Sequence, residues 1–170
     1  MSARPQAHEA APYYFTYIDR IPETNIVDVL EKQLDETSEL LSAISEEQSL
    51  HRYAPDKWSF RQVLGHLSDT ERMMLFRAFW FARNFDTPLP SFDQNVCAAA
   101  ARADDYSWAS HLAEFRASRL ATVAFFRNLP DEAWLRKGIA SENPFTVRAL
   151  AYLIAGHTSH HVAIVKERYL

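Results

Sequence analysis

The stretch that decides the fold is residues 145–169, FTVRALAYLIAGHTSHHVAIVKERY. Its apolar residues recur every three or four positions, which is the spacing of one face of an α-helix. The positions on this face are Val147, Leu150, Ile154, His157, His161, Ile164 and Arg168. Two positions therefore hold histidine where a packed helix is expected to hold leucine or isoleucine.

Three more windows of helical period lie between prolines, which break helix interiors and so divide the chain. We predict four helices, over about 24–47, 59–84, 107–129 and 145–169. No strand-like run bounded by hairpin turns is visible. Four amphipathic helices bury their apolar faces well as a bundle, so the sequence predicts an all-α protein, a four-helix bundle.

The connections between the predicted helices differ in length. Residues 85–107 form the longest irregular stretch, rich in proline, aspartate and small residues. That length could carry the chain from one end of the bundle to the other and make the second and third helices parallel. The segment is either a passive crossover or a functional lid. Residues 1–20 are expected to be an N-terminal extension of a single domain over 1–170.

Composition restricts the classes of protein that this chain can belong to. Its 170 residues are 48% hydrophobic and 13% aromatic, which excludes a disordered protein. A formal charge of −4 without a basic stripe argues against nucleic acid as a partner. The longest stretch without a charged side chain, Ala149–Val165, is too short to span a membrane. Residues 1–12 lack the apolar core of a signal peptide, and Cys97 is the single cysteine, so we expect a soluble cytoplasmic protein.

The histidines of the last predicted helix point to a metal site. His157 and His161 are four residues apart, which places two imidazoles one turn apart on one face. That spacing can place two ring nitrogens on one metal ion. His66 lies at the border of the apolar face of predicted helix 59–84 and could supply a third nitrogen in the bundle core. For each histidine alone, the alternative is a hydrogen-bonded core residue.

Two of the three glycines directly precede candidate ligands, Gly65 before His66 and Gly156 before His157. Glycine inside a helix costs about 1 kcal/mol relative to alanine, so we expect close helix approach or space for a substrate at these positions. His160 points about 100° away from His161 around the helix and is expected beside the site. The remaining histidines are expected on the surface: His8, His51 and His111.

Two stretches together resemble signatures of one family. Residues 53–71, YAPDKWSFRQVLGHLSDTE, resemble the second-helix signature of the DinB/YfiT-like superfamily, and residues 155–161, AGHTSHH, resemble its last-helix signature. Residues 90–93, PSFD, resemble the family's inter-helix loop. The resemblance covers the chain from about residue 20 to 170. It implies an up-down-down-up bundle whose divalent ion, such as Zn or Ni, is bound by His66, His157 and His161.

The resemblance also implies a function. Characterised relatives include transferases that use bacillithiol, mycothiol or glutathione, and a maleylpyruvate isomerase; many members are dimers. We therefore expect a homodimeric metal-dependent enzyme, either a thiol S-transferase or a hydrolase acting on a small-molecule electrophile. A low-molecular-weight thiol would be the cosubstrate of the transferase. The alternative is a bundle without catalysis that binds only metal or another protein.

Three carboxylates are candidates for catalytic roles. Asp69 lies about 60° from His66 around the helix and could orient an imidazole or act as a base. Glu71 lies about 140° away from His66 and faces a different neighbour. Asp93, in the long connection, could reach the open side of the site. For each, the alternative is a solvated acid or a structural ion pair.

Two arginines fall near the interior faces of their predicted helices, Arg77 and Arg148. We expect each of them to form a structural ion pair, and the alternative is that they bind an anionic group of the substrate. The aromatic residues around Trp80, including Phe76 and Phe79, could pack across a dimer partner.

Overall fold

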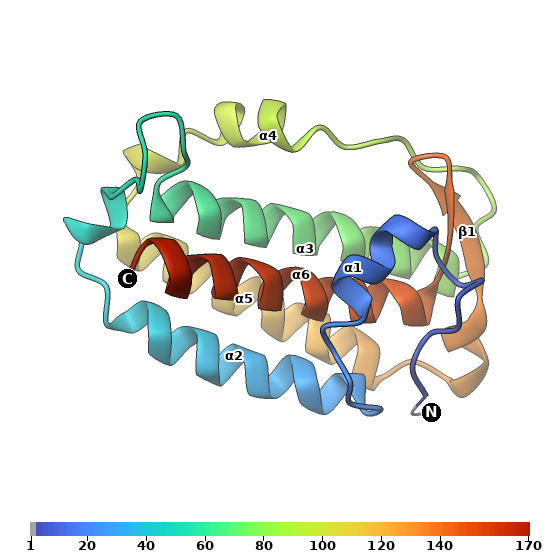
Figure 1. Ribbon diagram of the computed structural model, residues 1–170. Coiled ribbons are helices and arrows are strands. Elements are labelled where there is room, and N and C mark those ends of the chain that lie inside the picture. Colours follow the sequence, from blue (N-terminus) through green and yellow to red (C-terminus); the bar gives the residue numbers. More distant parts are fainter. Residues whose placement is uncertain (1–2) are drawn as a thin grey trace.

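The structure, a computed structural model, describes residues 3–170. These residues are mostly helical. They form six α-helices and one two-stranded sheet: α1 (Phe15–Ile18), α2 (Ile26–Ser42), α3 (Phe60–Ala82), α4 (Gln94–Ala101), α5 (Trp108–Arg127), β1 (Lys137–Ala140), β2 (Asn143–Thr146) and α6 (Val147–Arg168). Figure 1 shows the four long helices α2, α3, α5 and α6 lying along one another as a bundle. No helix within 3–170 is long and apolar enough to cross a membrane.

The ends of the long helices have local causes. At the start of α3, the backbone N–H of Gln62 donates to the Ser59 hydroxyl, and the Ser59 N–H donates to the Gln62 side chain. This reciprocal pair is a capping box, which satisfies two backbone donors at a helix start. The N–H of Ala149 donates to the Thr146 hydroxyl at the start of α6. Helix α6 therefore begins at Val147, two residues later than predicted, because β2 occupies the preceding residues.

The first half of α6 is the centre of the molecule. Every residue from 145 to 156 is buried, on all sides of the helix. Helix α6 contacts α1, α2, α3 and the hairpin strand β2. This part of α6 therefore has no exposed polar face, unlike a surface helix. The face that would contact water in a simple bundle is covered by neighbouring elements.

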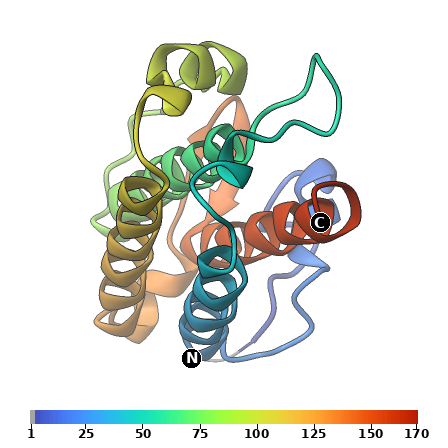
Figure 2. The ribbon, with the colours of Figure 1, turned by 90° about the vertical axis from the view of Figure 1, so that its left-hand side faces the viewer.

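The connection between α3 and α5 is more ordered than the sequence predicted. It contains α4 and a 3-10 turn at Ala103–Asp105, so the expectation of an irregular stretch over 85–107 was wrong. The Asp93 carboxylate accepts hydrogen bonds from the N–H groups of Asn95 and Val96, and a run of alanines follows. This cap and the high helix propensity of alanine explain the helix. Figure 1 shows the segment passing back along α3, and Figure 2 shows α4 outside the four long helices on the side of α3.

The expectation that the chain has no hairpin was also wrong. Strands β1 and β2 pair antiparallel, with Ala140 opposite Asn143. The two residues between them, Ser141 and Glu142, have φ angles of 50° and 62°. Two-residue hairpin turns require positive φ, which usually selects asparagine or glycine. Because serine and glutamate fill the turn, the sequence contains no recognisable hairpin signal.

The N-terminal segment folds back onto the bundle. Helix α1 lies across α6 in Figure 1, and the two helices are in contact. The Glu9 carboxylate is buried, accepting hydrogen bonds from the Thr146 hydroxyl and the Arg148 guanidinium. The N–H of Thr146 donates to the Glu9 carbonyl at 3.0 Å. Residues 3–20, which were expected to be an N-terminal extension, therefore contribute to the core through Ala10 and Ile18.

The ion pair of Glu9 predicts a pH-dependent stability. Burial raises the pKa of Glu9, but hydrogen bonds from Arg148, from the Gln6 N–H and from Thr146 outweigh burial, so the pKa lies below 4.5. A carboxyl with a lowered folded-state pKa stabilises the fold above its unfolded pKa, and this stability is lost as the pH falls through the folded value. We expect Glu9→Gln to lower the free energy of unfolding by about 3 kcal/mol at pH 7, and by much less near pH 3. Urea unfolding at both pH values measures this difference, and an equal loss at both would contradict the prediction.

Gly156 allows α1 to approach α6, as expected from the sequence, whereas Gly65 does not mark a close contact. A Cβ atom at position 156 would lie 2.1 Å from the Tyr17 carbonyl oxygen, and one at position 65 would lie 3.7 Å from the Ala103 Cβ. We expect Gly156→Ala to lower the free energy of unfolding by about 2 kcal/mol, because a backbone atom has to move. Gly65→Ala is the matched control and should be neutral or stabilising by up to about 1 kcal/mol. Equal losses in the two variants would show that helix packing does not distinguish the two sites.

Candidate metal centre

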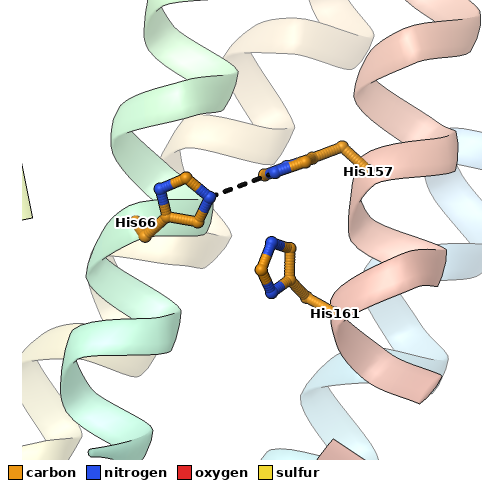
Figure 3. Close-up of side chains that lie close together, drawn as sticks. All are labelled: His66, His157 and His161. Carbon is orange, nitrogen blue, oxygen red and sulfur yellow. Dashed lines mark hydrogen bonds between the residues drawn. The ribbon is translucent and has the colours of Figure 1, made fainter. Parts of the chain in front are cut away.

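Three histidines meet between α3 and α6. Figure 3 shows His66 projecting from α3 toward His157 and His161, which project from α6. One ring nitrogen from each lies within 4.8 Å of the others, and Nε2 of His66 is 3.1 Å from Nε2 of His157. Among residues 3–170, no other group of three or more histidine, cysteine or acidic side chains has this geometry.

Burial keeps the three imidazoles neutral. It lowers the pKa of His66 to about 4, against a small opposing effect of Asp69. Burial, with the positive charge that His66 and His160 can carry, lowers the pKa of His161 to about 3. The pKa of His157 lies well below 6.5, first through burial and then through its histidine neighbours. Neutral imidazole is the form that binds a metal ion, so all three rings are ready to ligate at pH 7.

The geometry fits a divalent ion. Bonds of 2.0–2.1 Å in tetrahedral geometry separate two ligand nitrogens by about 3.3 Å, close to the 3.1 Å between the Nε2 atoms of His66 and His157. The Thr70 hydroxyl lies 3.4 Å from Nδ1 of His66 and can accept its proton, which leaves Nε2 with a free lone pair. Three neutral imidazoles suit zinc, nickel, copper or iron.

A cavity of about 210 Å³ opens beside the cluster. His66 and His157 line it, together with Tyr14 and Tyr17 of the N-terminal segment and Phe92 of the crossover. A larger cavity of about 590 Å³, between α2 and α6, contains none of the three histidines. Of these two cavities, only the smaller one therefore gives a ligand access to His66 and His157.

Aromatic side chains that the sequence analysis did not assign to the site flank the imidazoles. The Trp58 ring lies 5.0 Å from that of His66, between centroids. The Tyr17 ring lies 5.6 Å from that of His157 and 5.4 Å from that of His160. His160 is thus beside the centre, as expected. Tyr17 was missed because its place depends on how α1 docks, which has no local sequence signal.

The surface histidines were predicted with one error. His8 and His51 are exposed, as expected, but His111 is buried on α5. Its Nε2 lies 2.8 Å from the Ala103 carbonyl oxygen. The carbonyl belongs to the ordered crossover, so this burial could not be anticipated from α5 alone.

None of the three candidate carboxylates lines the cavity. Both Glu71 oxygens accept hydrogen bonds from the buried Arg119, at 2.8 and 2.9 Å. Asp93 caps α4 instead of facing the histidines. Asp69 accepts a hydrogen bond from the Cys97 thiol at 3.3 Å. Glu71 is thus in the structural ion pair that was its alternative, whereas catalytic roles for Asp69 and Asp93 stay predictions.

Arg119 was missed, although a signal for it exists. It lies on the apolar face of α5 at heptad spacing, in the series Leu112, Phe115, Arg119, Thr122 and Phe126. A charged residue at such a position predicts a buried partner, and Glu71 holds the corresponding position on α3 between Leu67 and Met74.

The two interior arginines, Arg77 and Arg148, differ in their hydrogen-bond partners. Arg148 pairs with Glu9, so the expected ion pair is present. Arg77 has no carboxylate at ion-pair distance within residues 3–170, and the expectation of an ion pair there was wrong. Its Nη2 donates instead to the Pro90 carbonyl at 2.9 Å and to the Ser141 hydroxyl at 2.7 Å.

The fold and the site define a class of protein: a helical bundle in which three histidines from two helices meet beside a small cavity. A family model described as the DinB superfamily matches residues 30–165, and the chain belongs to this superfamily. No curated protein sequence matches the chain.

Solved structures of other proteins share the fold. YfiT from Bacillus subtilis, described as a probable metal-dependent hydrolase with an unusual four-helix bundle topology, superposes with a TM-score of 0.72. The match has 19% identity and covers 98% of this chain and 91% of YfiT. The mycothiol-dependent maleylpyruvate isomerase superposes with a TM-score of 0.70 and 11% identity, over 85% of this chain and 61% of that one. At these identities the likeness shows the fold alone.

The cluster predicts stoichiometric metal binding. After loading with Zn or Ni and dialysis, we expect about one ion per chain by elemental analysis, and a loss of that ion in His157→Ala. His160→Ala is the matched control, because His160 neighbours the cluster without belonging to it. Equal metal loss in both variants, or no uptake by the wild type, would contradict the ligand set.

Proposed function

We propose that this protein is a divalent-metal-dependent enzyme that transfers a low-molecular-weight thiol to a small electrophile, with His66, His157 and His161 as the metal ligands. The observation that carries the proposal is the cavity against His66 and His157. A structural metal site is closed by its protein ligands, whereas a catalytic site keeps a position open. The cavity therefore favours catalysis over a bundle that only binds metal or protein.

The residues around the cavity favour a thiol as the nucleophile. A divalent ion, Zn or Ni, would supply a positive charge that lowers the pKa of a thiol or water that it binds. No carboxylate among the described residues lines the cavity, so the chain supplies no carboxylate base there. A free thiol has a pKa of about 8.5 and bulk water about 15.7. A metal ion therefore has to lower the pKa of a thiol much less than that of water for the proton to be lost near pH 7. The mycothiol-dependent relative of the same fold supports this choice.

The chain's own side chains orient the imidazoles of the cluster. The aromatic rings of Tyr17 and Trp58 pack against the imidazoles and restrict their orientation. The Thr70 hydroxyl, 3.4 Å from Nδ1 of His66, can hold the imidazole proton on that nitrogen, away from the cluster. Hydrolysis is the second candidate reaction, because YfiT, which has this fold, is described as a probable metal-dependent hydrolase.

We also infer an up-down-down-up order of the four long helices. The colours in Figure 1 support it, since α3 and α5 progress in one direction and α2 and α6 in the other. A homodimer stays a prediction. The exposure of Phe76 and Phe79, 49% and 39%, on one side of α3 supports a contact with a second copy there.

The reaction can be tested with the metal-loaded protein. We expect it to conjugate bacillithiol, mycothiol or glutathione to a small electrophile such as monochlorobimane, measured by fluorescence. His157→Ala should lower the rate by at least about 100-fold, while His160→Ala should keep most of it. Turnover of an ester without thiol would assign the site to hydrolysis instead. A metal-loaded protein that does neither would contradict an enzymatic function.

A further inference from the structure

Arg77 is a buried cation without an acidic partner. Its exposed fraction is 3%, and the carbonyl of Pro90 and the hydroxyl of Ser141 are its oxygen acceptors. Neither acceptor carries a charge. In the part of the chain that the structure describes, the other buried arginines each form an ion pair with a glutamate: Arg61, Arg119 and Arg148.

An uncompensated buried charge is unfavourable, so the environment of Arg77 requires an explanation. Both known oxygen contacts use Nη2. Nη1 contacts only the Met74 sulfur, at 3.9 Å, and no oxygen of residues 3–170 accepts from Nε. Nε and Nη1 can therefore still donate hydrogen bonds to a ligand. The positive charge of the guanidinium has no acidic partner among the described residues.

Arg77 lines the same cavity as His66 and His157. His66, Thr70, Met74 and Arg77 follow one another at helical spacing along one face of α3, and all line the cavity. Arg77 follows His66 by eleven positions, which places their Cα atoms about 16 Å apart along the helix. Of the described residues that line this cavity, Arg77 is the only one with a formal charge when the histidines are neutral.

The hairpin turn orients the guanidinium. Ser141, whose hydroxyl accepts from Arg77, has a φ of 50°, a conformation that is uncommon for a residue other than glycine. Such strain is often found where it positions a functional group. The turn and the Pro90 carbonyl together hold Nη2 and leave the other side of the guanidinium free.

We propose that Arg77 binds the carboxylate of a small substrate whose reactive part lies at the histidine cluster. A guanidinium pairs with a carboxylate through two parallel hydrogen bonds. One arginine without a lysine matches a single negative charge better than a phosphate dianion. Tyr14, Phe92 and Met73 give the space between the two ends an apolar lining, which suits an aromatic or aliphatic body. This proposal rests on the proposed function in one respect: the reaction is taken to occur at the histidine end of the cavity.

Binding of phenylacetate and of its neutral amide, phenylacetamide, tests the charge at Arg77. Calorimetric titration uses the full chain, freed of metal at pH 7.5 so that the carboxylate cannot bind an ion. We expect the wild type to bind the acid at least about tenfold more tightly than the amide, and Arg77→Met to lose this preference. Arg116→Met, at an exposed arginine on α5, is the matched control and should keep it.

Three outcomes would overturn the proposal. They are equal binding of acid and amide by the wild type, an unchanged preference in Arg77→Met, and tighter binding of phenyl phosphate than of phenylacetate. Metal uptake by the same variants separates this proposal from the enzymatic one. A wild type that prefers the acid but takes up no metal would support the role of Arg77 and contradict the metal site.

Thermal unfolding distinguishes a binding role from a structural one. If the role of Arg77 is to bind a ligand, the substitution Arg77→Met should change the Tm of the ligand-free protein by less than about 3 °C, because no ion pair is broken. Arg148→Met removes a paired arginine of the same interior and should lower Tm much more. A loss in Arg77→Met as large as in Arg148→Met, or a failure of Arg77→Met to fold, would show that Arg77 is structural.

Discussion

The ion pair between Arg119 and Glu71 is the constraint on which the bundle depends. Arg119 has no exposed surface, and from α5 it reaches all three other long helices. It donates to Glu71 on α3, to the Gln33 side chain and the Leu30 carbonyl on α2, and to the Thr158 hydroxyl on α6. A buried guanidinium is tolerated only when its donors are satisfied, so these contacts restrict how each helix is rotated and shifted against the others.

That restriction also positions the three histidines His66, His157 and His161. Glu71 follows His66 on α3 by five residues, and Thr158 directly follows His157 on α6. A shift of α3 along α6 would break the contacts around Arg119 and would also separate the imidazoles of His66 and His157. The ionic layer and the histidine cluster are therefore set by one helix register, and an acid that looked catalytic in the sequence is needed to maintain it.

The site then has a simple electrostatic character. Its acids are engaged elsewhere, its histidines are neutral through burial, and its one charged lining residue is Arg77. A cavity with a histidine end, an apolar middle and a cationic end is a different environment from one with a carboxylate base. Arg119 forms an ion pair with Glu71 and stabilises the fold. Arg77 has no acidic partner among the described residues and is available to a ligand.

The sequence by itself determined the helical class and the histidine pair, because helical period and the spacing of His157 and His161 are local properties of the backbone. The helix starts followed from local signals such as the Ser59 cap, to within about two residues, whereas α2 ends at Ser42, five residues before the predicted end. Only the tertiary structure decided that Glu71 faces Arg119, that the Ser141 turn exists, and that Tyr17 of the N-terminal segment lies at the site. These contacts join residues far apart in the chain, and they depend on how helix faces are rotated against one another, which no local pattern specifies.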